Sequence, residues 1–501
     1  MSDNPYRKLG GQTIIYGFGT IIPRVLNYIV LTAYYTRRLE VQQYGIITEL
    51  YAYIAIFLVI MTFGLETGFF KFYLSKDKDK LFSSIAILLF STSLIFITGG
   101  IIFSGKISEV IQYKNYPEYV KWAMAIVGID ALTNIFIAKL RIEEKIKKFV
   151  IVQLFNVFLT IVLVLFFFEI LPKLNTTANH LFLLNYLQGL NRVYLIFLAN
   201  FIASGVRLFI LFSEMKGIRI KFDSYLIKEI LIYSLPLLLA QLSGIFNESV
   251  DRIMLRHFLP EGTDKLYEIG IYGANFRIAM LMTIFIQMFR YAADPFYFSS
   301  YNDKNSRKIY ADVFKYFVIF CMIIFLLIML YIHYFKFFID SKYHSGLYIV
   351  PVILFSSFMT GVLFNLNIWY RLTGKTYYGI YIIGTGAVVT FILNALLIPG
   401  MGYYGCAITR LVSSTIMVLL SYLAGKRFFK VPYDLRKVFL YIIFAIAIYV
   451  FNKYFTSKML LINTLKNTLF FGGFIYYLVR KEKLLDIFIL KKYENKNTKQ
   501  V

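Results

Sequence analysis

Apolar stretches long enough to cross a bilayer recur along almost the whole of this 501-residue chain. Hydrophobic residues make up 59% and charged residues 16% of the chain, whereas soluble proteins carry about a half and about a quarter. The stretches span residues 12–35, 45–70, 81–103, 119–138, 149–171, 184–212, 228–250, 268–291, 313–334, 347–370, 377–398, 402–424, 437–452 and 459–479. They predict an all-α polytopic membrane protein of about 14 transmembrane helices, without a sizeable soluble domain.

The loops between these stretches differ in charge from one side of the membrane to the other. The chain has 53 Lys and Arg residues against 28 Asp and Glu. If the N-terminus is cytoplasmic, roughly 32 basic residues fall on the cytoplasmic side and roughly 12 on the outer side, as membrane proteins prefer. We therefore expect a multi-pass protein of the bacterial cytoplasmic (inner) membrane with both termini in the cytoplasm. Topology accounts for the basic excess, so no nucleic-acid partner is expected.

An internal repeat divides the chain. Arg141 and Lys145 follow the fourth stretch, and Arg371 and Lys375 follow the tenth with the same Arg-x-x-x-Lys spacing. Gly45 likewise opens the second stretch much as a glycine opens the eighth, about 225 residues later. The sequence predicts an N-lobe of helices 1–6 over residues 1–215 and a C-lobe of helices 7–12 over 216–425. Residues 426–501 would then hold helices 13–14 and a basic cytoplasmic tail.

Residues typical of metal or cofactor chemistry lack the spacing that such sites require. Cys321 and Cys406 lie in separate apolar stretches, and the four histidines show no metal-ligand spacing. The run Gly374-Lys375-Thr376 is not a phosphate-binding loop, because position 369 is a tryptophan where the motif needs glycine. We expect no cofactor, no metal and no enzyme activity.

Three motifs resemble those of a known family. They are Tyr44-Gly45, the Gly64-Leu-Glu-Thr-Gly68 end of the second stretch, and the tract from Asn394 through Pro399 to Ala407. Their order and the layout of six, six and two helices resemble polysaccharide flippases of the Wzx type, whose superfamily also holds MurJ and the MATE exporters. Over residues 10 to 425, this resemblance implies a flippase for isoprenoid-diphosphate-linked oligosaccharide in polysaccharide biosynthesis, lipopolysaccharide biosynthesis included. It implies no particular sugar.

Arginines inside the predicted spans are the candidate binding residues. They are Arg24, Arg192, Arg207, Arg277 and Arg410. Each costs roughly 2.5 to 3.5 kcal/mol at the centre of a membrane helix, so we expect each to face water, an acid or a ligand. A guanidinium grips a phosphate with parallel donors, which suits a cationic cavity for a diphosphate headgroup. The structural alternative is that Arg207 extends to the cytoplasmic surface and that Arg192 pairs with Asp130 or a backbone carbonyl.

The resemblance singles out two of these arginines and two prolines. Wzx and MurJ proteins carry cavity-facing cations on helices one and eight, which is where Arg24 and Arg277 stand. Pro23 and Pro236 should kink helices one and seven, the helices that bend in the superfamily, and would act as gates. Packing alone is the alternative explanation for both prolines.

Two other functions compete with flipping. A MATE-like exporter of organic cations would need carboxylates where this chain has arginines. A membrane polysaccharide polymerase or glycosyltransferase would need a large soluble loop or an acidic catalytic cluster. The expected partners are the lipid-linked oligosaccharide, membrane lipids and other polysaccharide-assembly proteins, and the expected form is a monomer.

Overall fold

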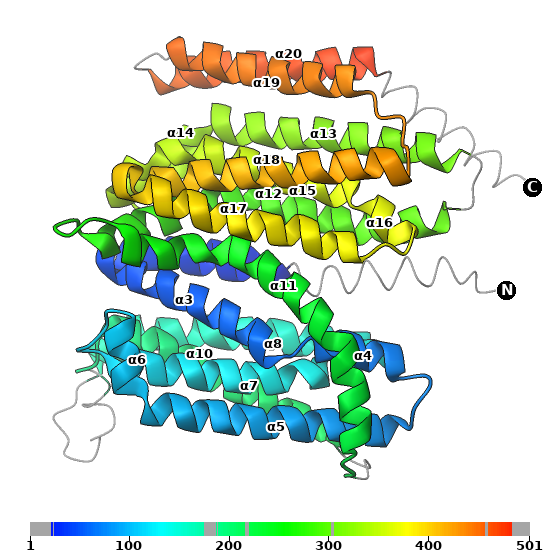
Figure 1. Ribbon diagram of the computed structural model, residues 1–501. Helices are drawn as coiled ribbons and strands as arrows, with labels where there is room; N and C mark the ends of the chain where they lie inside the picture. The colour runs from blue at the N-terminus through cyan, green and yellow to red at the C-terminus, as the bar shows by residue number, and fades with distance from the viewer. Residues whose placement is uncertain are drawn as a thin grey trace, which may run out of the picture.

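The computed structural model describes residues 22–23, 25–174, 187, 189–215, 220–301, 305–455 and 459–482, and all regular structure there is helical (Figure 1). The principal helices are α2 (Thr32–Arg38), α3 (Val41–Met61), α4 (Leu65–Phe72), α5 (Lys78–Ile102), α6 (Ser104–Val110), α7 (Pro117–Ile142), α8 (Ile146–Leu165), α10 (Arg192–Leu211), α11 (Ser224–Phe258), α12 (Lys265–Ser299), α13 (Ser306–Leu330), α14 (Ile332–Phe335), α15 (Val350–Leu366), α16 (Ile368–Leu372), α17 (Tyr377–Met401), α18 (Tyr403–Phe428), α19 (Leu435–Tyr454) and α20 (Leu460–Lys481). Short π-helical and 3-10 segments extend several of them: η1 (Asn27–Leu31), η2 (Phe166–Ile170), η3 (Leu171–Lys173), η4 (Phe212–Met215), η5 (Lys336–Phe338) and η6 (Ser341–Ile349).

Twelve helical segments among the described residues are long and apolar enough to cross a membrane. They correspond to the second to thirteenth stretches predicted from the sequence, so the all-α polytopic membrane fold is confirmed. Of the first stretch, only residues from 22 onward are described in part, and α2 follows directly. The fourteenth stretch forms α20, which contains the polar residues Asn463, Lys466 and Asn467 and is not among the twelve.

Helix α11 runs diagonally between the earlier and the later helices of the bundle (Figure 1). Near its start, the chain approaches α4 so closely that a Cβ atom on Gly64 would lie 2.8 Å from the carbonyl oxygen of Ser234. Gly64 also has a φ of 65°, which favours glycine. Further along, the Asn247 side chain donates to the Ile383 carbonyl of α17 at 3.3 Å. Pro236 lies between these two contacts, inside the helix. The two ends of α11 therefore pack on different parts of the bundle.

Helices α3 and α12 cross in close contact at the end where both begin. A Cβ atom on Gly45 would collide with the Leu266 carbonyl, and one on Gly270 would collide with the Val41 carbonyl. Deeper in the crossing, a Cβ on Gly273 would lie 2.6 Å from the Thr48 side chain. Small residues let helix backbones approach in this way. This contact joins an early helix to a later one.

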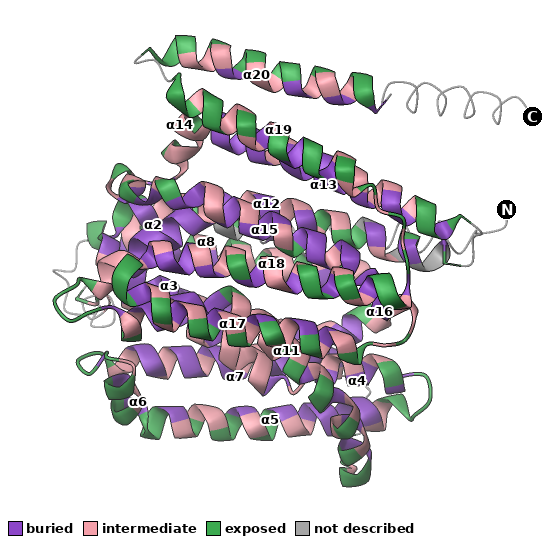
Figure 2. Ribbon diagram, turned by 45° about the horizontal axis from the view of Figure 1, so that its top comes forward, coloured by how far each residue is buried: buried purple, intermediate pink, exposed green. Residues whose placement is uncertain are grey.

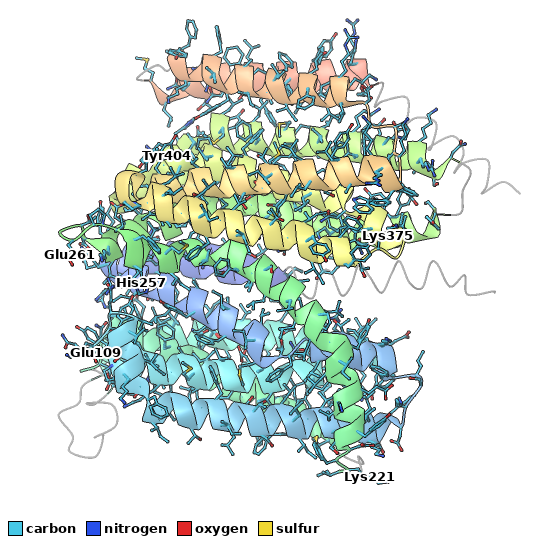
Figure 3. All side chains as sticks on the ribbon, viewed as in Figure 1. Glu109, Lys221, His257, Glu261, Lys375 and Tyr404 are labelled. Carbon is cyan, nitrogen blue, oxygen red and sulfur yellow. The ribbon has the colours of Figure 1, made fainter. Side chains whose placement is uncertain are left out.

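The two ends of the bundle differ in the side chains that they present. Lys221 and Lys375 lie at one end, and Glu109, His257, Glu261 and Tyr404 lie at the other (Figure 3). We call the first the basic end; it contains the connections 73–77, 143–145, 373–376 and 429–434. The sequence-based topology predicts that the basic end is cytoplasmic.

A capping residue fixes the start of α11 at the basic end. The Asp223 carboxylate accepts from the backbone N–H groups of Tyr225 and Leu226. It also pairs with Lys80 of α5 at 2.7 Å. The hydrogen bond from Lys80 and those backbone bonds hold the pKa of Asp223 below its usual range. Such a cap satisfies N–H groups that a helix start leaves free, and here it also ties α11 to an early helix.

Helices α19 and α20 lie at the edge of the bundle against α13, and much of their surface is exposed (Figure 2). The buried Asn467 of α20 donates to the Leu330 carbonyl at the end of α13. At the other end of α20, Glu482 pairs with Lys315 of α13 at 2.7 Å. The contacts of this helix pair therefore lie on the side of α13 and not in the middle of the bundle.

Candidate functional site

A central cavity of about 300 Å³ lies between early and later helices. Its walls come from α2, α3, α10, α11 and α12. Tyr35, Tyr51 and Asn200 contribute from the early helices, and Arg252 and Arg277 from the later ones. The close crossing of α3 and α12 lies beside it, because Thr48 and Gly273 also line this cavity.

A second and larger cavity of about 850 Å³ lies among the later helices, and we call it the C-terminal chamber. Its walls come mainly from α11, α12, α15, α17 and α18, and it reaches Tyr370 and Arg371 of α16 at the basic end. Serine, threonine, asparagine and glutamine side chains are abundant in these walls. Glu248 lines both cavities. One carboxylate therefore faces the chamber and the central cavity.

Two guanidinium groups stack on one phenylalanine beside the central cavity. Arg252 and Arg410 lie 4.5 Å and 4.8 Å from the centroid of the Phe276 ring. Arg252 also donates to the Glu248 carbonyl at 2.8 Å. Arg277, which follows Phe276 directly in α12, lines the same cavity. Among the described residues that line the central cavity, the two cations Arg252 and Arg277 thus outnumber the single carboxylate, Glu248.

A buried network fixes Arg410. It donates to the fully buried carboxylate of Asp251 at 3.4 Å and to the Asn247 carbonyl at 3.1 Å. Tyr272 and Asn394 donate to the same carboxylate at 2.7 and 3.3 Å. A buried carboxylate needs such partners because leaving water is costly. Arg410 is therefore largely engaged in holding α11 to α18, although it also lines the C-terminal chamber.

The basic end of the chamber holds a second pair of arginines around a phenylalanine. Arg290 and Arg371 lie 4.6 and 5.7 Å from the centroid of the Phe364 ring. Arg371 pairs with Asp294 at 2.6 Å. The early helices contain an equivalent ion pair, between Arg141 and Glu66.

The structure separates the five arginines that the sequence grouped together. Arg277 and Arg410 line the two cavities. Arg207 lines neither and pairs with Asp130 of α7 at 2.7 Å. Arg24 lies outside the described residues, whereas its neighbour Pro23 is described and buried.

The prediction that Arg192 lies well inside a span is wrong. Arg192 is the first residue of α10, because Asn191 caps the helix by accepting from the Val193 N–H. Its guanidinium donates to the Arg38 carbonyl, as the structural alternative foresaw.

The sequence patterns did not indicate Arg252, Arg290 or Arg371 as site residues. Arg252 was missed because the seventh span was expected to end at residue 250, whereas α11 continues to Phe258. The signal that could have placed its end is Pro260, the first helix breaker after that point. Arg290 stood near the expected end of its span, and α12 extends to Ser299.

Among the described residues, no group of three or more His, Cys, Asp or Glu side chains could hold a metal ion. Cys321 and Cys406 are buried free thiols.

No family model and no curated protein matches this sequence. Solved structures do match. "Lipid II flippase MurJ, inward closed conformation" aligns with 93% of this chain and 99% of its own, at a TM-score of 0.71 and 15% identity. An inward-facing multidrug resistance MATE family transporter of the MOP superfamily aligns with 83% of this chain and 97% of its own, at a TM-score of 0.64 and 14% identity. An outward-facing multidrug resistance MATE family transporter aligns with 84% of this chain and 95% of its own, at a TM-score of 0.55 and 15% identity. These likenesses show that the chain has the fold shared by MurJ and the MATE exporters, as the sequence predicted.

Proposed function

We propose that this protein is a flippase that moves an isoprenoid-diphosphate-linked oligosaccharide from the cytoplasmic to the outer leaflet during polysaccharide biosynthesis. In this proposal, residues 1–215 and 216–425 form two lobes that expose the central cavity to each side in turn. The chain lies in a bacterial cytoplasmic membrane as a monomer, with the basic end in the cytoplasm.

The observation that carries this proposal is the cluster of Arg252, Arg277 and Phe276 at the central cavity. A diphosphate that enters a low-dielectric cavity loses hydration, and fixed guanidinium groups replace it with charge-assisted hydrogen bonds. Stacking on Phe276 occupies the face of the Arg252 guanidinium and leaves its edge available to oxygen atoms. An anionic headgroup therefore fits this cavity.

The adjacent chamber suits the oligosaccharide part of the substrate. Its hydroxyl and amide side chains can exchange hydrogen bonds with sugar hydroxyl groups. The isoprenoid tail would stay among the lipids. An organic cation, the cargo of the competing exporter, would meet a surplus of positive charge in the central cavity.

Deletion strains distinguish these functions. Loss of the gene should cause lipid-linked repeat units to accumulate on the cytoplasmic side while polymerase activity persists. The full-length chain should restore surface display, and Arg277→Glu should not. Arg307→Glu is the matched control, because Arg307 stacks on Phe429 and lines neither cavity. Completed short chains displayed on the surface of the deletion strain would indicate a polymerase function instead. Surface display in the deletion strain equal to that of the parent strain would refute the proposal.

A further inference from the structure

Arg290 differs from the other cavity arginines in its use of hydrogen-bond donors. Arg252, Arg371 and Arg410 each donate to a backbone carbonyl or a carboxylate. Within the described part of the chain, Arg290 has only the ring of Phe364 against its guanidinium, and no acid lies within ion-pair distance. Its side chain is exposed inside the chamber. The chamber therefore holds one cation whose edge donors no described side chain engages.

The surroundings of Arg290 favour an oxyanion. The guanidinium lies over Phe364, which leaves its planar fork of N–H donors to bind two oxygen atoms at once. The single negative charge of Asp294 is paired with Arg371. Together, Arg290, Arg371 and Asp294 therefore carry a net positive charge. Farther inside the chamber, the fully buried Ser356 hydroxyl makes no hydrogen bond in the structure. A buried hydroxyl without a partner costs free energy unless a ligand or water satisfies it.

We propose that Arg290, stacked on Phe364, is a second binding station for a diphosphate, occupied before the headgroup reaches Arg252 and Arg277. This inference rests on the proposed flippase function. Along α12, Arg290 and Arg277 are thirteen residues apart, which is about 20 Å at 1.5 Å per residue. A headgroup entering at the basic end would thus meet Arg290 first. It would then pass the polar walls of the chamber and Glu248, which borders both cavities.

Protection of arginine side chains from chemical modification tests this station without any amino-acid substitution. Purified full-length chain in lipid nanodiscs is treated with phenylglyoxal, and modification of each arginine is followed by mass spectrometry. The probes are farnesyl diphosphate and, separately, inorganic pyrophosphate. At concentrations several times its dissociation constant, we expect farnesyl diphosphate to slow modification of Arg290 and Arg277 at least about fivefold, because a bound diphosphate covers the guanidinium donors. Arg307, which lines neither cavity, should react at an unchanged rate.

The outcomes separate this inference from the proposed function. Protection of Arg277 without protection of Arg290 would overturn the second station and leave the flippase proposal standing. Protection of neither arginine would contradict both. If pyrophosphate protects Arg290 as well as farnesyl diphosphate does, the site binds a free anion, and its role in loading a lipid headgroup is refuted. Protection at lower concentrations of farnesyl diphosphate supports a lipid headgroup.

Variants provide an independent measurement in reconstituted vesicles that contain a labelled lipid-linked oligosaccharide. Arg290→Gln should raise the substrate concentration for half-maximal flipping about tenfold, and Arg290→Lys should raise it less because it keeps the charge but loses the fork. Protection of Arg277 by farnesyl diphosphate should persist in Arg290→Gln, which shows that the variant is folded. If both variants reach half-maximal flipping at the same substrate concentration as the wild-type protein, Arg290 is not a binding station.

Discussion

Gly45 and Gly270 stand 225 positions apart in the sequence and pack against each other's helices where α3 crosses α12. Each glycine faces a backbone carbonyl, that of Leu266 or Val41, and those two residues are also 225 positions apart. Thr48 and Gly273, which touch deeper in the crossing, have the same separation. The contacts of the crossing are therefore related by a constant offset of 225 residues, which is the relation expected of the two predicted repeats.

A side chain at either glycine should loosen this crossing. Gly45→Ala and Gly270→Ala place a Cβ atom against backbone, which must move. A cysteine introduced into the central cavity as Ala55→Cys can report this loosening, because the cavity lies beside the crossing. We expect this cysteine to react with an impermeant maleimide, added from outside, at least several-fold faster in the Gly45→Ala or Gly270→Ala variant than in the chain with both native glycines. The native cysteines are buried.

Gly99→Ala is the matched control, because a Cβ atom at Gly99 meets no atom within 4 Å. Equal labelling rates in the Gly45→Ala, Gly270→Ala and Gly99→Ala backgrounds would show that the crossing does not close the cavity.

Asp251 and Arg410 should contribute to the free energy of unfolding as a coupled pair, so that losing either residue costs more than half of what losing both costs. Removing one partner leaves the other buried without compensation, so Asp251→Ala and Arg410→Ala should each cost about 3 to 5 kcal/mol. The double variant Asp251→Ala/Arg410→Ala should lose less than the sum of the two single losses. Thermal unfolding midpoints in detergent measure this coupling, and additive losses would contradict it.

The ion pair between Arg371 and Asp294 should tolerate exchange of its charges. Arg371→Asp alone places two carboxylates together, whereas Arg371→Asp with Asp294→Arg restores opposite charges. Both side chains are about one-third exposed, so the expected recovery is small, about 1 kcal/mol. The same exchange at Arg141 and Glu66 should behave alike if the repeats are equivalent. A double variant no more stable than the single one would contradict the pairing.

The charge of the loops predicts that the basic end is cytoplasmic. Reporter fusions after Gly374 and after Lys481 should therefore be active only as cytoplasmic reporters. A fusion after Gly262, in the connection between α11 and α12, should report the outer side. A periplasmic signal after Lys481 would mean an odd number of spans.

The sequence was most informative where one local pattern decides the structure. Apolar stretches predicted the twelve helical segments that are long and apolar enough to cross a membrane, because a helix in a bilayer must satisfy its own backbone groups. The sixth apolar stretch begins at residue 184, whereas α10 begins at Arg192, because Asn191 caps the helix there. Local charge alone could not show that Arg192 stands at this boundary.

Tertiary pairing was beyond local patterns. Arg410 and Asp251 are 159 residues apart, and only the packing of α18 on α11 brings them together. Asp130 was named as a partner for Arg192, yet it pairs with Arg207, because the depth and direction of each side chain are set by helix packing. The C-terminal chamber could not be predicted, because its wall is assembled from residues of several helices that are far apart in the sequence.

Flipping by purified protein tests the central claim most directly. Full-length chain is reconstituted into vesicles with a fluorescent isoprenoid-diphosphate oligosaccharide, and dithionite bleaches the label that reaches the outer leaflet. We predict that wild type and Arg307→Glu make the label of both leaflets accessible. Arg277→Glu should leave the inner-leaflet label protected, because a carboxylate in the central cavity repels the diphosphate. Arg277→Glu vesicles that bleach as completely and as fast as wild type would contradict the cationic-cavity account.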